Sequence, residues 1–139
     1  MTKDVLITIS GIQLLDDGQD DVEMITRGDY YQKNGKHYIL YDECLEGFGG
    51  TVKNIIKVSP DSIDIIKKGV TTAHMQFEKN KKNLSCYNTP LGELIIGVRA
   101  NQIRIDEQED RLDIDVEYSL DINYQHASEC NIRVNVQAM

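Results

Sequence analysis

Residues 111–121 read Arg-Leu-Asp-Ile-Asp-Val-Glu-Tyr-Ser-Leu-Asp, with an apolar or aromatic side chain at every second position. Successive side chains of a β-strand point to opposite faces of a sheet, whereas a helix would scatter these residues around its circumference. The pattern therefore predicts a strand with one apolar face and one charged face. Asp113, Asp115 and Glu117 share the charged face, so we interpret them as the solvated side of a sheet rather than as a metal or acid/base site.

The rest of the chain repeats this alternation in short segments. Turn residues separate the segments about every 8 to 12 residues, as in antiparallel sandwiches and barrels, and no window has the pattern of a long amphipathic helix. Asn34-Gly35 is the strongest hairpin signal, because both central residues of a type I′ turn need positive φ. The other predicted strands are residues 5–10, 22–31, 37–43, 51–58, 62–67, 72–77, 84–87, 93–99, a short one at 102–106, and 129–136.

The apolar members of the later strands are assigned to a single interior. They are Ile63, Ile65, Ala73, Met75, Phe77, Leu84, Cys86, Leu94, Ile96, Val98, Leu112, Ile114, Val116, Tyr118, Leu120, Ile132, Val134 and Val136. An open meander of about eight to ten strands exposes two unpaired edges, and closure removes them. The sequence therefore predicts an all-β fold in which residues 1–139 form one antiparallel meander β-barrel. A two-sheet sandwich is the alternative.

Charge and cysteine content limit the partners and the compartment. The formal net charge of −8 opposes binding to a phosphate backbone, so we expect no nucleic-acid partner. No apolar run approaches the roughly 20 residues of a membrane span, and the N-terminus lacks a signal-peptide pattern. The three cysteines, at positions 44, 86 and 130, lack Cys-x-x-Cys spacing. We expect reduced thiols and a cytoplasmic protein.

Five short motifs follow one another along nearly the whole chain. They are Gly28-Asp29-Tyr30-Tyr31, Tyr41-Asp42-Glu43, Gly50-Thr51-Val52-Lys53 with Lys57-Val58, Met75-Gln76-Phe77, and Tyr87-Asn88-Thr89-Pro90-Leu91-Gly92 before the strand of Leu94, Ile96 and Val98. In this order they resemble the YwiB-like bacterial proteins, a family of unknown function. The resemblance implies a calycin-type β-barrel, related in shape to lipocalins and fatty-acid-binding proteins. It supplies no catalytic residues.

The sequence offers no pattern typical of a metal or cofactor site. His37, His74 and His126 lie far apart and lack the spacing of zinc ligands, so we interpret them as surface or rim residues. The acidic turn at residues 16–21 lacks the glycine and glutamate positions of an EF-hand. We therefore expect no metal, no cofactor and no catalytic residue. An enzyme is the third hypothesis, which would require a cleft that joins Lys53 or His74 to a carboxylate of perturbed pKa.

The leading functional hypothesis is a non-enzymatic barrel that holds a small, largely apolar ligand. Inward tyrosines would orient it, although the alternative that they are satisfied core groups stays open. Register decides whether Tyr38 or Tyr41 faces inward. The candidate ligand-binding residues are Tyr38, Tyr41, Met75, Phe77, Tyr118 and Tyr124.

The alternative hypothesis is a protein-interaction or structural module that acts as a homo-oligomer, for example a homodimer. Apolar residues also occur on the face opposite the assumed interior, and a continuous outer patch would mark a partner surface. The residues assigned to that face are Leu6, Ile25, Ile39, Ile55, Ile66 and Ile95.

Overall fold

The computed structural model describes residues 3–11, 23–45, 50–90 and 92–139, which form ten antiparallel strands. The acidic turn at residues 16–21 and the segment at residues 46–49 lie outside these ranges. The strands are β1 (Asp4–Ser10), β2 (Glu23–Lys33), β3 (Lys36–Leu45), β4 (Gly50–Val58), β5 (Ser62–Gly69), β6 (Ala73–Glu78), β7 (Lys82–Thr89), β8 (Gly92–Glu107), β9 (Arg111–Ile122) and β10 (Gln125–Ala138).

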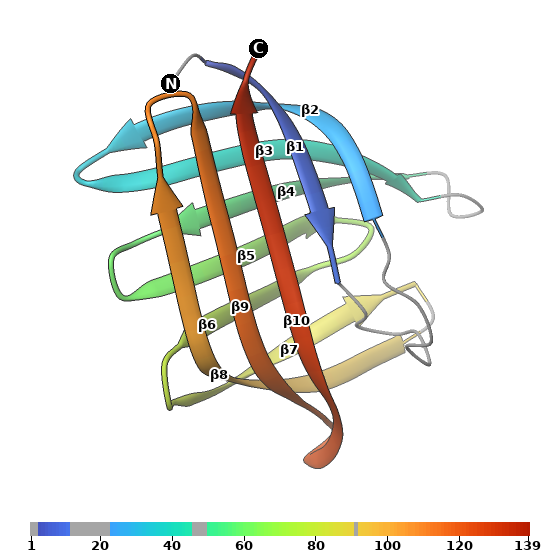
Figure 1. The fold of residues 1–139 in the computed structure, drawn as a ribbon. Helices are drawn as coiled ribbons and strands as arrows, with labels where there is room; N and C mark the ends of the chain where they lie inside the picture. Colours follow the sequence, from blue (N-terminus) through green and yellow to red (C-terminus); the bar gives the residue numbers. More distant parts are fainter. Residues whose placement is uncertain (1–2, 12–22, 46–49, 91) are drawn as a thin grey trace.

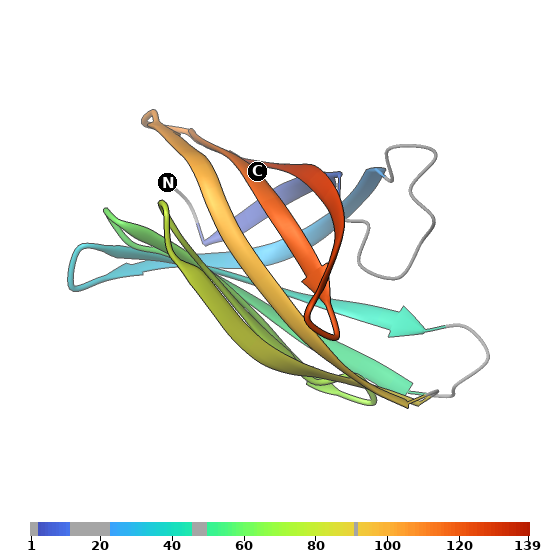
Figure 2. The same cartoon turned by 90° about the horizontal axis from the view of Figure 1, so that it is seen from below.

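The strands form one sheet that closes almost completely on itself. Each strand pairs with its neighbours in sequence except at β6 and β7, and β1 also pairs with β10, so the sheet order is β6-β5-β4-β3-β2-β1-β10-β9-β8-β7. Figure 1 shows β2 to β6 behind β1, β9 and β10, whose strands cross them steeply. Figure 2 shows the two layers edge-on. The predicted all-β meander barrel is confirmed.

The barrel has a seam between β6 and β7, where the ladder is interrupted. Within the described residues, two isolated bridges join the segments around these strands, one at each end. They pair Thr72 with Asn88 and Glu78 with Lys81. Between the bridges, the Asn83 amide donates to the main-chain oxygen of Gln76 at 2.9 Å. A side chain therefore spans the seam where backbone hydrogen bonds would otherwise join the strands.

One long strand replaces two that the sequence predicted. Segments 93–99 and 102–106 form the single strand β8, whose pairing with β9 shifts register between Ala100 and Gln102. A β-bulge bends a strand and increases its twist. In Figure 1 the first half of β8 lies beside β7 and the second half beside β9, so β8 forms a corner of the barrel.

Two tight turns contain consecutive residues with positive φ. Asn34 and Gly35 have φ of 54° and 74°, which confirms the predicted hairpin. Asn123 and Tyr124, with φ of 50° and 70°, form the turn between β9 and β10. Tyr124 thus lies at a hairpin tip, and its side chain is 71% exposed. The expectation that it lines the interior is wrong, because the strand ends before it.

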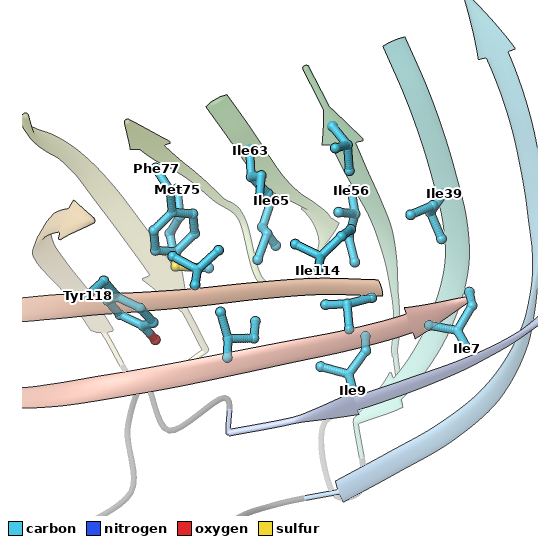
Figure 3. Packing of buried hydrophobic residues seen from close by; sticks show 14 of the residues in the cluster. Ile7, Ile9, Ile39, Ile56, Ile63, Ile65, Met75, Phe77, Ile114 and Tyr118 are labelled. Carbon is cyan, nitrogen blue, oxygen red and sulfur yellow. The ribbon is translucent and has the colours of Figure 1, made fainter. Parts of the chain in front are cut away.

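Alternation along each strand fills the barrel with aliphatic and aromatic side chains. Residues 112, 114, 116, 118 and 120 of β9 are all buried, as the sequence predicted. Figure 3 shows Ile114 and Tyr118 of this strand facing the isoleucines and the Met75 and Phe77 side chains of the opposite layer. The rings of Phe77 and Tyr118 meet edge to face, with centroids 4.9 Å apart. This part of the interior is filled by side chains.

The assignment of Leu84 and Cys86 to the interior is wrong. Both side chains are exposed, whereas Tyr87 is buried. Directly opposed residues of paired strands share a face, and Tyr87 pairs with Leu94, whose side chain packs against the core. Register with β8 therefore turns Leu84 outward, where it pairs with Gly97.

Candidate functional site

A row of inward side chains crosses four strands at one end of the barrel. The register pairs Tyr41 with Asn54, Asn54 with Lys67, and Lys67 with Ala73, from β3 through β6. Because opposed residues share a face, all four side chains point inward. Asn54 and Lys67 are 1% and 7% exposed, although lysine is almost never buried without a partner. The row thus places polar groups inside a largely apolar barrel.

Hydrogen bonds join this row to a carboxylate. Lys67 Nζ lies 2.8 Å from Asn54 Oδ1 and 3.2 Å from Glu43 Oε1. The amide nitrogen of Asn54 also donates to Glu43 Oε1 at 3.2 Å. Lys67, Glu43 and Asn54 therefore form a closed triangle of contacts. We call these three residues together with Tyr41 and Tyr87 the inner polar cluster.

The two tyrosines of the cluster have hydroxyl groups that bond to no other described residue. Tyr41 and Tyr87 are 5% and 8% exposed. Every fully buried side-chain nitrogen or oxygen in the described part of the chain has a hydrogen-bond partner. The unbonded hydroxyls of Tyr41 and Tyr87 therefore border space that a small molecule or water can reach.

Burial and a nearby charge keep both hydroxyls protonated. Burial is the main cause that raises the pKa of Tyr41 and of Tyr87, and the negative charge of Glu43 raises both further. A neutral phenol donates a hydrogen bond, whereas a phenolate cannot. Tyr41 and Tyr87 are thus available as donors near Glu43.

The cluster lies beside the seam. Ala73, the last residue of the row, starts β6, and the neighbouring Thr72 exchanges main-chain hydrogen bonds with Asn88 of β7 at 2.8 and 2.9 Å. Tyr87 precedes Asn88 and faces inward. The small side chain of Ala73 therefore lies between Lys67 and the seam, next to Tyr87.

The structure places some of the ligand-binding residues proposed from the sequence inside the barrel and others outside it. Tyr41, Met75, Phe77 and Tyr118 are buried inside the barrel. Tyr38 is on the outer face, where its ring stacks on that of Tyr31 with centroids 4.7 Å apart. Register thus places Tyr41 inside and Tyr38 outside, so Tyr38, like Tyr124, cannot contact a ligand in the interior.

Tyr118 and Met75 differ in their relation to the inner polar cluster. The pKa of Tyr118 is raised by burial first and by the neighbouring Cys130 of β10 second. Met75 belongs to the next inward row, Ile39-Ile56-Ile65-Met75, which directly adjoins the polar row. Met75 can therefore contact a molecule seated at the cluster, whereas Tyr118 interacts with Cys130 of β10.

Sequence reasoning missed Glu43, Asn54 and Lys67. Alternation carried on from Ile39 and Tyr41 would have placed Glu43 inside, and alternation from Ile63 and Ile65 would have placed Lys67 inside. Polar residues at strand ends are ordinarily solvated, so the pattern alone gave no reason to extend the inner face to them.

A second polar contact closes the other end of the barrel. The Tyr30 hydroxyl lies 2.6 Å from His37 Nδ1, and His37 Nε2 lies 2.8 Å from Glu107 Oε1. Burial, followed by the charge of Glu107, raises the pKa of Tyr30. An activated nucleophile requires a lowered pKa, so this chain of contacts is better suited to holding β3 against β8 than to catalysis.

The outward carboxylates of β9 are paired with neighbouring side chains. Asp113 accepts from the Asn135 amide at 2.5 Å and Asp115 from the Asn131 amide at 2.6 Å. Arg133 also approaches Asp115 at 3.4 Å. These contacts agree with a solvated sheet face. Among the residues described, no group of three or more His, Cys, Asp or Glu side chains could hold a metal ion.

Comparison with known proteins assigns the family. The profile of a domain of unknown function, DUF1934, matches residues 7–134. The chain belongs to this family. The uncharacterized beta-barrel protein YwiB of Bacillus subtilis (strain 168) is 28% identical over 123 residues, which cover 88% of this chain and 85% of YwiB.

The fold of the chain also matches the crystal structure of YwiB. The crystal structure of YwiB from Bacillus subtilis superposes with a TM-score of 0.82 at 25% identity, covering 99% of this chain and 92% of that one. The predicted resemblance to the YwiB-like proteins is confirmed. The described part of the chain includes no helix with the length and hydropathy needed to span a membrane.

Proposed function

We propose that this member of the DUF1934 family is a non-enzymatic binding protein that holds one small, largely apolar ligand inside the barrel. The observation that carries the proposal is the pair of buried, unbonded hydroxyls of Tyr41 and Tyr87 beside the buried Lys67. If this position served only to fill the interior, apolar side chains would do so without leaving any hydroxyl group unbonded. A polar cluster at the edge of an apolar interior is the usual arrangement of a small-molecule site.

The apolar part of the ligand would extend along the row that ends at Met75. That row is aliphatic from Ile39 to Ile65 and leads toward Phe77. Apolar contact would supply most of the affinity, and the hydroxyls of Tyr41 and Tyr87 would fix the orientation. The three free cysteines agree with action in a reducing cytoplasm.

Native mass spectrometry of freshly purified protein tests the proposal. We expect a mass in excess of the polypeptide that disappears on denaturation. The double variant Tyr41→Phe/Tyr87→Phe should lose this excess mass. The matched control Tyr31→Phe/Tyr38→Phe changes two tyrosines on the outer face and should retain it. A native mass equal to that of the polypeptide, with no small-molecule uptake on addition of amphiphiles, would refute the proposal.

A homodimer is the second candidate function, favoured by an apolar row on the outer face. Leu40 pairs with Ile55, and Ile55 with Ile66, so three half-buried aliphatic side chains lie in line across β3, β4 and β5. Ile39, which the sequence assigned to this face, is instead buried inside. Subunit counting in the same mass spectra tests the dimer, and Ile55→Asp should abolish it. Ile25→Asp, at a 61% exposed position on β2, is the control.

A further inference from the structure

We infer that the inner polar cluster selects a ligand whose head group is uncharged and accepts hydrogen bonds, such as an alcohol, an amide or a ketone. This inference rests on the proposed function and specifies the chemistry of that same site. It follows from a count of charges and a count of free donors in the cluster.

The charges of the cluster cancel. Lys67 contributes one positive charge and Glu43 one negative charge, with Nζ and Oε1 3.2 Å apart. The other members, Tyr41, Asn54 and Tyr87, are neutral. A carboxylate head would therefore enter next to Glu43 without an unpaired cation to meet it, and an ammonium head would enter next to Lys67 without an unpaired anion. Both would also lose hydration on entry, so both are disfavoured relative to a neutral head.

The free hydrogen-bonding groups of the cluster are mainly donors. Two of the three donors of Lys67 contact Asn54 and Glu43, which leaves one. The hydroxyls of Tyr41 and Tyr87 add two more, and burial, followed by the charge of Glu43, raises the pKa of both and favours their protonated form. A head group with a carbonyl or hydroxyl oxygen can accept from these donors. An alkyl group alone would leave them unmet.

The cluster also gives a way to invert this selectivity by one substitution. Glu43→Gln keeps an amide within reach of Asn54 but leaves Lys67 without its anion, so the site becomes positive and should prefer a carboxylate. Lys67→Gln leaves Glu43 without its cation, so the site becomes negative and should prefer an ammonium. A site that recognised only the apolar chain would respond to neither substitution.

The test compares four unbranched probes of ten carbon atoms each: decanol, decanamide, decanoate and decylammonium, titrated by calorimetry at neutral pH. For the unmodified protein we expect decanol or decanamide to bind at least about tenfold more tightly than either ion. A tenfold difference in affinity corresponds to about 1.4 kcal/mol of binding free energy. In Glu43→Gln the affinity for decanoate should rise by about tenfold or more and exceed that for decanol. In Lys67→Gln the same should hold for decylammonium.

Matched controls place the same charge changes outside the barrel. Asp42→Asn is adjacent to Glu43, and Lys53→Gln is adjacent to Asn54, yet both side chains are exposed on the outer face. Neither should alter the order of the four probes. Circular dichroism of each variant verifies that it is folded, and the ranking in the unmodified protein tests the inference without any substitution.

The outcomes separate the two proposals. If no probe binds the unmodified protein, the proposed function fails and this inference fails with it. If probes bind but decanoate or decylammonium ranks first, the inference is overturned while binding inside the barrel stands. An unchanged ranking in Glu43→Gln would overturn it in the same way.

Discussion

Replacing Lys67 with methionine should destabilise the barrel, and replacing Glu43 as well should restore most of the loss. Methionine matches the length of the buried part of lysine but removes the charge and the donors. In the single variant Lys67→Met, Asn54 Oδ1 and Glu43 Oε1 lose a donor at 2.8 and 3.2 Å. In the double variant Lys67→Met/Glu43→Gln, the new amide can donate to Asn54, and no buried charge remains.

The magnitude follows from the burial of each partner. Breaking a fully buried ion pair from one side costs about 3–5 kcal/mol. The Glu43 side chain is 28% exposed, so water recovers part of its solvation, and we expect Lys67→Met to cost about 2–3 kcal/mol. Glu43→Gln leaves the ammonium of Lys67, whose side chain is 8% exposed, and should cost a similar amount. Since neutral replacement of a buried pair is often close to neutral in stability, the double variant should lie within about 1 kcal/mol of the unmodified protein.

Urea unfolding followed by far-ultraviolet circular dichroism measures these differences, provided that the slope against denaturant stays constant. Lys53→Met, on the outer face of β4, is the control and should change the free energy of unfolding by less than about 0.5 kcal/mol. The result that contradicts this reasoning is a double variant less stable than either single variant. Such a result would mean that the ion pair is itself a main source of stability.

Three further predictions follow from the packing, the tyrosines and the seam. A Cβ added at Gly28 would lie 2.4 Å from the main-chain oxygen of Leu40, so Gly28→Ala should cost about 1–3 kcal/mol in urea unfolding. Gly97→Ala should cost under about 1 kcal/mol, because its nearest contact is the mobile end of the exposed Leu84; equal losses would contradict the packing argument. Burial raises the pKa of Tyr41 and Tyr118 above the ordinary value of 10.0, so the folded state keeps these protons longer than the unfolded state. The free energy of unfolding should therefore be constant just below pH 10 and fall above it by about 1.4 kcal/mol per pH unit for each such tyrosine, and each Tyr→Phe variant should reduce that slope, as alkaline urea titrations would show. Main-chain amides of β6 and β7 that face the seam should exchange with deuterium at least about tenfold faster than those of β9, which is paired on both sides; similar protection would argue that the seam is closed in solution.

The strands and their buried faces could be predicted because they depend on local patterns. The alternation at residues 111–121 gives both the strand and its inner face, and it is correct from Leu112 to Leu120. Asn34-Gly35 gives the first hairpin because few residue pairs tolerate two positive φ values. Asn123-Tyr124 adopts the same geometry with a tyrosine in the second position, so composition did not reveal that turn.

Contacts between strands decided the rest. Whether Tyr38 or Tyr41 faces inward, and whether Leu84 or Tyr87 does, depends on the register with β4 and β8, which residues far along the chain impose. The interruption between β6 and β7 likewise depends on closure of the whole sheet.

The amino-acid sequence by itself determined an all-β meander with an apolar interior, because the period of two is a property of each strand alone. Only the tertiary structure decided that Tyr41, Asn54 and Lys67 share one inward row with Glu43 beside them. The physical reason is that a strand pattern says which face a residue occupies but not which residue lies opposite. A buried lysine becomes recognisable only when its partners on neighbouring strands are in place.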